Sequence, residues 1–298
     1  HRAFGRHRGG CQVRAAMRAL LAVLLLAGPA LAQENSGLAE LVTREELRGF
    51  EPVGRVDIEN GGFCTGTLIA PDLVLTAAHC AMEPGGPIAA DRITFRAGLA
   101  YGTALVEAQV LRTVVDPAYR PVDPAPPEII ERDVALLQLA EPIPSALISP
   151  YAVARPTSGD EVSVVSYAQG REEALSWQRV CHVVGREGRL IAFDCEVSFG
   201  SSGAPVLDRS GYRPRIVSIV SAGGEYDGEA VSFGMELPAQ VDWLKAALRR
   251  GEVTSEAAAP AAADGGASQP AAVARASSRP RRLETGFAAS YLRDIRVP

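Results

Sequence analysis

Three polar residues of this sequence stand beside short apolar runs, in the chain order histidine, aspartate, serine. His79 directly follows the strand-like run Leu73–Ala78, Asp133 directly precedes another apolar run, and Ser202 lies in a glycine-containing string. A serine hydroxyl is a poor nucleophile at neutral pH, so a neighbouring imidazole must accept its proton. A buried carboxylate can hold that imidazole in the correct tautomer. These residue types together can carry out nucleophilic catalysis on an acyl group.

The string around the serine, Phe199–Pro205, reads FGSSGAP. Glycines on both sides let the backbone turn sharply and present the hydroxyl and nearby N–H groups to one point. Each of the three residues also has a plainer interpretation when taken alone. The histidine would be structural, the aspartate a solvated strand end, and the serine string an ordinary turn between strands.

Two cysteines stand close to the histidine. Cys64 and Cys80 are sixteen residues apart and could join the strands on either side of their loop, which would fix the imidazole of His79. In the chain-entropy account, a disulfide closing such a loop stabilises the fold by roughly 3 kcal/mol. The chain has five cysteines, and Cys11 falls in a segment that we expect to be removed. The four that remain are an even number, which in an exported protein indicates two disulfides.

The first 32 residues have the composition of upstream residues and a secretory signal. Met17 and Arg18 precede the apolar run Ala19–Ala27, and small residues follow up to Ala32, where we expect cleavage. A membrane anchor is the alternative, but a Gly-Pro pair interrupts the apolar run well below the roughly 20 residues that a spanning helix needs. We therefore expect a secreted or periplasmic protein with no stable membrane span after signal cleavage.

Composition and charge limit the kinds of protein, partner and cofactor that this sequence can represent. Hydrophobic residues make up 47% of the 298 residues and charged residues 22%, as in an ordinary globular protein, which excludes a wholly disordered chain. The formal net charge is −5, so no general basic field suggests nucleic acid as a partner. Without the signal, only His79 and His182 remain as histidines, and His182 is interpreted as structural. No ligand set has zinc spacing, and we expect no cofactor.

The elements that must position these residues are short. Apolar, partly β-branched runs broken by Gly and Pro predict two sets of strands in an antiparallel barrel or sandwich, separated by the proline-rich stretch Glu141–Pro156. Pro238 opens an amphipathic stretch at helical spacing. The predicted organisation is an N-terminal extension over 33–51, which could hold a short helix, β-domains over 52–143 and 144–250, and a low-complexity linker and tail over 251–298.

The order and flanking motifs of His79, Asp133 and Ser202 resemble the trypsin/chymotrypsin-like serine proteases, closest to the exported bacterial branch with the glutamyl endopeptidases. The resemblance covers roughly Pro52–Arg250. It implies an all-β fold of two antiparallel six-stranded β-barrels with a C-terminal helix and an active site between the barrels. It also implies Ser202 as nucleophile, His79 as general base and then acid, Asp133 as orienting carboxylate, and the N–H groups of Gly200 and Ser202 as oxyanion hole.

Two departures from the family concern the string Phe199–Pro205, which we call the serine loop. Ser201 stands where mammalian members have an aspartate that receives the freed N-terminus, and no Ile-Val-Gly-Gly start is present. We therefore predict no zymogen switch of that kind and an oxyanion loop held in some other way. Ala204 replaces the common second glycine. Cys181 and Cys195, just before this loop, are expected to form the second disulfide.

The sequence indicates less clearly which substrate residue the primary specificity pocket selects. Glu196 matches the position whose acid selects Arg or Lys in trypsin, whereas Val220 stands where glutamyl endopeptidases have a histidine. The segment from Ser221 to Gly223 resembles the edge that pairs with the substrate backbone. A basic and a small apolar primary residue both stay open, with glutamate less favoured.

The sequence thus predicts a serine endopeptidase that acts on protein or peptide substrates through an acyl-enzyme intermediate. The alternative is a catalytically silent, protease-like binding protein. A third hypothesis is an envelope protease of the high-temperature-requirement type. Such proteases carry a PDZ module after the barrels, and the residues after Arg250 are too few for a domain of ordinary size.

Overall fold

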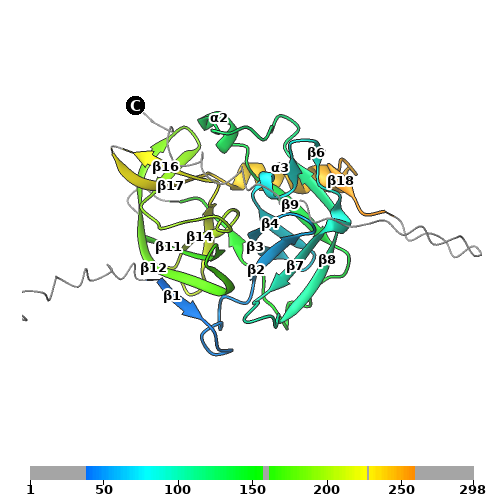
Figure 1. The fold of residues 1–298 in the computed structure, drawn as a ribbon, viewed down its shortest axis with the longest axis horizontal. Helices are drawn as coiled ribbons and strands as arrows, with labels where there is room; N and C mark the ends of the chain where they lie inside the picture. The colour runs from blue at the N-terminus through cyan, green and yellow to red at the C-terminus, as the bar shows by residue number, and fades with distance from the viewer. Residues whose placement is uncertain (1–37, 157–160, 227, 259–298) are drawn as a thin grey trace, which may run out of the picture. The chain divides into compact units, whose positions relative to one another are not determined.

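The fold was obtained as a computed structural model, which describes residues 38–156, 161–226 and 228–258. The predicted signal over 1–32 and most of the predicted tail lie outside the described residues. Figure 1 shows two β-sheets, one with strands β2–β4 and β7–β9 and the other with strands including β11, β12, β14, β16 and β17. Within the described residues, no helix has the length and apolar character needed to cross a membrane.

The first sheet closes into a six-stranded barrel. Its strands pair in the order β8-β7-β2-β3-β4-β9, and β8 also pairs with β9, which completes the ring. The bounds are β2 Val53–Ile58, β3 Phe63–Ala70, β4 Leu73–Thr76, β7 Ile93–Ala97, β8 Val106–Val115 and β9 Ala135–Leu139. Short elements between them are η1 (Ala78–Cys80), β5 (Met82–Glu83), β6 (Gly86–Pro87), η2 (Ala90–Arg92) and α2 (Pro127–Ile130).

The second sheet has nine strands in the order β10-β15-β14-β11-β12-β13-β17-β16, with β1 paired to β12. The bounds are β1 Leu38–Leu41, β10 Ala152–Val153, β11 Glu161–Ala168, β12 Arg171–Glu187, β13 Leu190–Phe193, β14 Pro205–Asp208, β15 Arg215–Ile219, β16 Ala222–Tyr226 and β17 Glu229–Met235. The sheet therefore has more strands than the predicted six, because short strands such as β1 and β10 add to it.

The cores of both sheets consist of aliphatic and aromatic side chains. Phe95, Leu68 and Leu75 are fully buried in the first sheet, and Phe193 and Phe233 in the second. Strands β4, β9 and β14 bury nearly every residue, which is the reason their sequences are mostly apolar rather than alternating. The all-β prediction is confirmed.

The predicted C-terminal helix is α3, Pro238–Arg249. It buries Val241, Leu244, Ala247 and Leu248 at helical spacing and packs against β8 and β9 of the first barrel. The chain then adds β18 (Ser255–Glu256) to β8, within the stretch expected to be linker. The end of the chain's described part is thus anchored on the first barrel, although α3 follows the last strand of the second sheet (Figure 1).

The N-terminal extension differs from the short helix considered for it. Residues Leu38–Leu41 form β1, which pairs antiparallel with β12, and turns follow it. Phe50 then packs against Trp177 of β12, with ring centroids 5.0 Å apart. The extension is therefore held by the edge of β12, whose backbone groups supply the hydrogen bonds that a short isolated helix would lack.

Candidate active site

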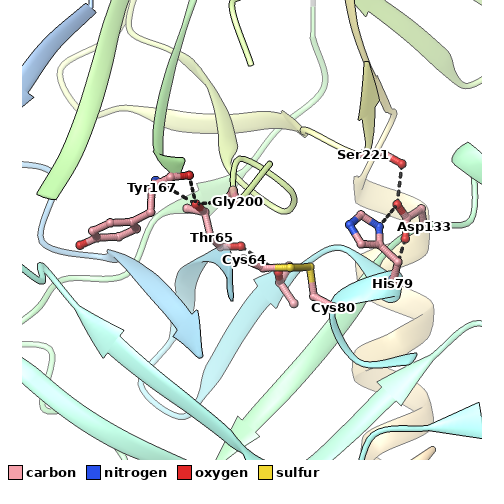
Figure 2. Close-up of a disulfide and its surroundings, with 9 residues drawn as sticks. Cys64, Thr65, His79, Cys80, Asp133, Tyr167, Gly200 and Ser221 are labelled. Atoms are coloured by element: carbon pink, nitrogen blue, oxygen red, sulfur yellow. Dashed lines mark hydrogen bonds and ion pairs between the residues drawn. A yellow bond between two sulfur atoms is a disulfide. The ribbon is translucent and has the colours of Figure 1, made fainter. Parts of the chain in front are cut away.

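The histidine and the aspartate predicted for catalysis form a tight pair. His79 lies in η1, directly after β4, and Asp133 lies between α2 and β9, which pairs with β4. His79 Nδ1 is 2.7 Å from Asp133 Oδ2, and the backbone N–H of His79 donates to Oδ1 at 2.9 Å (Figure 2). Since an ionised carboxylate only accepts hydrogen bonds, Nδ1 carries the proton and Nε2 of the neutral ring can accept one.

A serine completes the surroundings of the carboxylate. Ser221, which follows β15 and is buried, donates from its hydroxyl to Asp133 Oδ2 at 2.5 Å (Figure 2). Its backbone N–H donates to Phe233 O at 2.8 Å, which fixes Ser221 on the second sheet. Ser221 is predicted from the sequence for the substrate edge, and its contact with Asp133 was not predicted. The carboxylate therefore receives donors from both sheets.

Burial and pairing act in opposite directions on the two groups. Burial raises the pKa of Asp133, but the charge of His79 and the hydrogen bonds from His79 and Ser221 outweigh it, so its pKa is below the ordinary value. Burial lowers the pKa of His79, but the charge and hydrogen bond of Asp133 raise it above the ordinary value. The pair therefore favours an ionised carboxylate and stabilises an imidazolium beside it.

Both predicted disulfides are present in the structure. The Cys64–Cys80 bond, 2.07 Å long, joins β3 to η1 next to His79 (Figure 2). The Cys181–Cys195 bond, 2.09 Å long, joins β12 to the segment that leads into the serine loop. Each disulfide therefore holds a segment that bears a predicted site residue.

The serine loop requires glycine at two positions. Gly200 and Gly203 have φ values of 91° and 76°, a region that residues with a side chain rarely adopt. A Cβ on Gly200 would collide with the ring of Phe63, and one on Gly203 with Thr76 Oγ1 and the carbonyl of Thr65. The loop thus lies directly against the first barrel.

Paired and unpaired N–H groups alternate along this loop. The N–H groups of Ser201, Gly203 and Ala204 donate to Ser198 O, Val220 O and Ser201 O at 2.9, 2.7 and 2.9 Å. The N–H groups of Gly200 and Ser202 donate to no residue within 38–156, 161–226 and 228–258. Two unpaired donors on either side of a buried residue can bind a negatively charged oxygen.

The hydrogen bonds of the described residues join His79 to Asp133 but do not join His79 to Ser202. Ser202 is half-buried, and its carbonyl accepts a hydrogen bond from the N–H of Thr65 at 2.8 Å. Without substrate, hydrogen bonds to a catalytic hydroxyl are often long, so this arrangement does not exclude the serine. In Figure 2 the imidazole of His79 lies on the side of Asp133 that faces the loop of Gly200.

Comparison with known proteins identifies the family. Residues 64–212 match the trypsin-like peptidase domain. The chain belongs to this family. Among solved structures, this trypsin-like peptidase is similar in fold to a Glu endopeptidase in complex with MPD, with a TM-score of 0.59 and 19% sequence identity. The alignment covers 72% of this chain and 96% of that chain. No curated protein matches the sequence.

The other predicted specificity residues lie on either side of the serine loop in the sequence, Glu196 before it and Gly223 after it. The side chain of Glu196 is exposed and forms no ion pair with a described residue, while its N–H donates to Gln178 Oε1 at 2.7 Å. Gly223 is in β16, opposite Ser232 of β17. Gly223 of this trypsin-like peptidase thus lies in the last strand of the second sheet's path, and Glu196 faces solvent.

Among the residues that the structure describes, two clusters contain atoms of the kind that bind metals. One is Cys64, Cys80 and His79, and the other is Cys181, Cys195 and Asp194. In each cluster the two sulfurs are bonded to each other, so they are not thiolates and only one ligand atom remains. Neither cluster, as folded, offers a metal the ligands it needs.

Proposed function

We propose that this trypsin-like peptidase is an exported serine endopeptidase that hydrolyses peptide bonds through an acyl-enzyme on Ser202. The observation that carries the proposal is the coexistence of two features. One is the His79–Asp133 pair, whose carboxylate also accepts from Ser221. The other is the pair of unpaired N–H groups at Gly200 and Ser202. A base held in one tautomer and donors for an oxyanion are what acyl transfer to serine requires.

In the acylation step, Ser202 Oγ attacks the carbonyl carbon of the scissile peptide bond. His79 Nε2 accepts the hydroxyl proton as the new C–O bond forms, and the carbonyl oxygen becomes an oxyanion. The N–H groups of Gly200 and Ser202 bind that oxyanion. Asp133 remains ionised and stabilises the imidazolium, consistent with the raised pKa of His79. The C–N bond then breaks and the imidazolium gives its proton to the leaving amine.

In the deacylation step, water attacks the ester formed on Ser202. His79 Nε2 accepts a proton from this water, and the same N–H groups bind the second oxyanion. Collapse of the intermediate breaks the bond to Oγ, and the proton on His79 returns to the serine. The carboxylic acid product leaves, and the site is in its starting state.

The substrate backbone is proposed to pair with β16. This strand is the last in the path of the second sheet, so its outer edge can accept an extended peptide beside Gly223. We retain Glu196 as a candidate specificity residue, with a basic primary residue as the class that its carboxylate would favour. The exposure of Glu196 leaves a small apolar primary residue equally open.

Export is supported by the two disulfides, because such bonds persist in oxidising compartments. The signal predicted for residues 1–32 agrees with it. The catalytically silent binding protein stays the alternative, and the unpaired N–H groups of Gly200 and Ser202 favour the enzyme.

Hydrolysis of a peptide library by residues 33–298, followed by mass spectrometry, tests the proposal and resolves the primary residue. Cleavage by the wild type that is lost in Ser202→Ala supports it, and Glu196→Gln shows whether that carboxylate selects basic residues. A folded, disulfide-intact protein that cleaves none of the peptides favours the binding protein.

A further inference from the structure

The residue that departs from the mammalian family pattern, Ser201, lies in a fully buried and neutral environment. Its hydroxyl is 3.1 Å from the hydroxyl of Ser166 on β11, which is also buried. The N–H of Ser198 donates to Ser201 Oγ at 3.3 Å. The hydrogen-bond partners of Ser201 in the described residues are thus hydroxyl and backbone groups, and none is charged.

A second contact to the loop comes from the first barrel. Thr65, fully buried on β3, donates from Oγ1 to Gly200 O at 2.8 Å and from its N–H to Ser202 O at 2.8 Å. Its Oγ1 accepts from the N–H of Tyr167 on β11 at 3.0 Å, and its carbonyl accepts from Thr76 Oγ1 at 2.8 Å. Figure 2 shows Thr65 between Tyr167 and Gly200. Every polar atom of Thr65 therefore connects β3 to β4, β11 or the serine loop.

The same loop has its peptide planes fixed through their carbonyls. In a trans peptide the N–H points opposite to the C=O of the preceding residue, so a hydrogen bond to that carbonyl also sets the direction of the N–H. The N–H of Gly200 shares its plane with Phe199 O, which accepts from Gln169 N at 2.6 Å. The N–H of Ser202 shares its plane with Ser201 O, which accepts from Ala204 N at 2.9 Å.

Thr65 fixes the next peptide plane after each of these two, which are the planes between Gly200 and Ser201 and between Ser202 and Gly203. It holds the carbonyls of Gly200 and Ser202, which are the residues with unpaired N–H groups. The contact of Ser166 with Ser201 fixes the residue between them. The four consecutive carbonyls from Phe199 to Ser202 are therefore each hydrogen-bonded. The directions of the Gly200 and Ser202 N–H groups are fixed as a result, and these two groups have no partner among the described residues.

We propose that Thr65 and Ser166 are positioning residues that hold the loop Ser198–Gly203 with its two N–H donors directed at the oxyanion. They do so through neutral hydrogen bonds from both sheets, without an ion pair. The proposal rests on the proposed function in assigning those N–H groups to an oxyanion.

The same two strands supply matched controls. Thr67, on β3, and Ser163, on β11, are buried hydroxyl residues whose oxygen atoms have no hydrogen-bond partner in the described residues. Thr65→Val and Ser166→Ala remove the contacts to the loop. Thr67→Val and Ser163→Ala make the same chemical changes two and three residues away without touching it.

The kinetic experiment compares these four variants on one peptide substrate. We expect kcat to fall about 10- to 100-fold in Thr65→Val and Ser166→Ala with KM little changed, because a misdirected donor weakens only the transition state. Affinity for a peptide boronic acid, which mimics the tetrahedral intermediate, should fall in parallel. Thr65→Ser, which keeps the hydroxyl, should restore most of kcat, and both control variants should stay within about twofold of wild type.

Amide hydrogen exchange over residues 198–204 tests the same proposal without using activity. Exchange should accelerate there in Thr65→Val and Ser166→Ala and not in the two controls. Unchanged exchange and unchanged kcat in Thr65→Val would overturn the proposal, as would an equal effect of Thr67→Val. If the wild type itself cleaves no peptide, the proposed function fails, and the exchange comparison still decides whether Thr65 and Ser166 hold the loop.

Discussion

Replacement of Asp133 by asparagine tests the role of the carboxylate without changing its size. The carboxylate Oδ2 is 2.7 Å from His79 Nδ1 and the side chain of Asp133 is almost fully buried. Unit charges about 4 Å apart attract by about 4 kcal/mol at the effective dielectric constant of proteins, which is about 20. The imidazolium formed in the transition state loses this attraction in Asp133→Asn.

At about 1.4 kcal/mol for each factor of ten, that loss lowers kcat about 10³-fold. An asparagine amide that turns its NH₂ toward Nδ1 would also favour the wrong tautomer of His79, which brings the expected loss to about 10³–10⁴-fold. The chain offers Asp91→Asn, an exposed aspartate in η2, as a control that should keep its activity.

The pH profile gives a second readout of the same variant. The base must be neutral to accept a proton, so kcat/KM rises with pH through the pKa of His79. Asp133 raises that pKa, so its removal should shift the rise to lower pH. Initial rates for both variants and the wild type between about pH 4 and 9 measure this shift. A kcat within tenfold of wild type, or a rise displaced to higher pH, would refute the reasoning.

Three further changes probe the surroundings of the site. Ser221→Ala removes a hydrogen bond to a buried carboxylate and should lower the free energy of unfolding by about 1.5–3 kcal/mol in urea at pH 7. That loss should shrink as the pH falls and the carboxylate is protonated. The pKa of Asp133 is lowered in the folded state, so its ionised form stabilises the fold at neutral pH and this stabilisation is lost in acid. Replacing Cys64 and Cys80 by alanine should cost roughly 3 kcal/mol in the same assay, and a loss below about 1 kcal/mol would contradict the loop-closure argument. Gly203→Ala should abolish peptide hydrolysis because its Cβ meets backbone, whereas Gly102→Ala, also at positive φ but with open space, should cost only about 1 kcal/mol of stability and no activity.

The strands that the sequence predicted best are those whose pattern is local. Strand β8, Val106–Val115, is one of the apolar, partly β-branched runs from which the two sets of strands are predicted. Leu38–Leu41 has no such pattern, and it is a strand because β12 offers it a backbone edge. The segment Ser255–Glu256 likewise owes its strand to β8, on a stretch whose composition suggested a linker.

The site residues likewise divide into those with a local sequence signal and those without one. His79 and Asp133 were predicted from their flanking motifs, and the structure brings them together. Thr65, Ser166 and Ser221 were not predicted in these roles, because each depends on a partner far away in the chain. Thr65 and its acceptor at Gly200 are 135 residues apart, and no local pattern marks a buried hydroxyl as a partner of that loop.

The central claim is that Ser202 is an activated nucleophile beside a formed oxyanion hole. Labelling of residues 33–298 with a fluorophosphonate, mapped by mass spectrometry next to a Ser202→Ala control, tests it most directly. The account predicts one phosphonyl group per chain on Ser202, none in the control, and slower labelling in Asp133→Asn. A folded, disulfide-intact protein that takes up no label, or takes it up equally in the control, would contradict it.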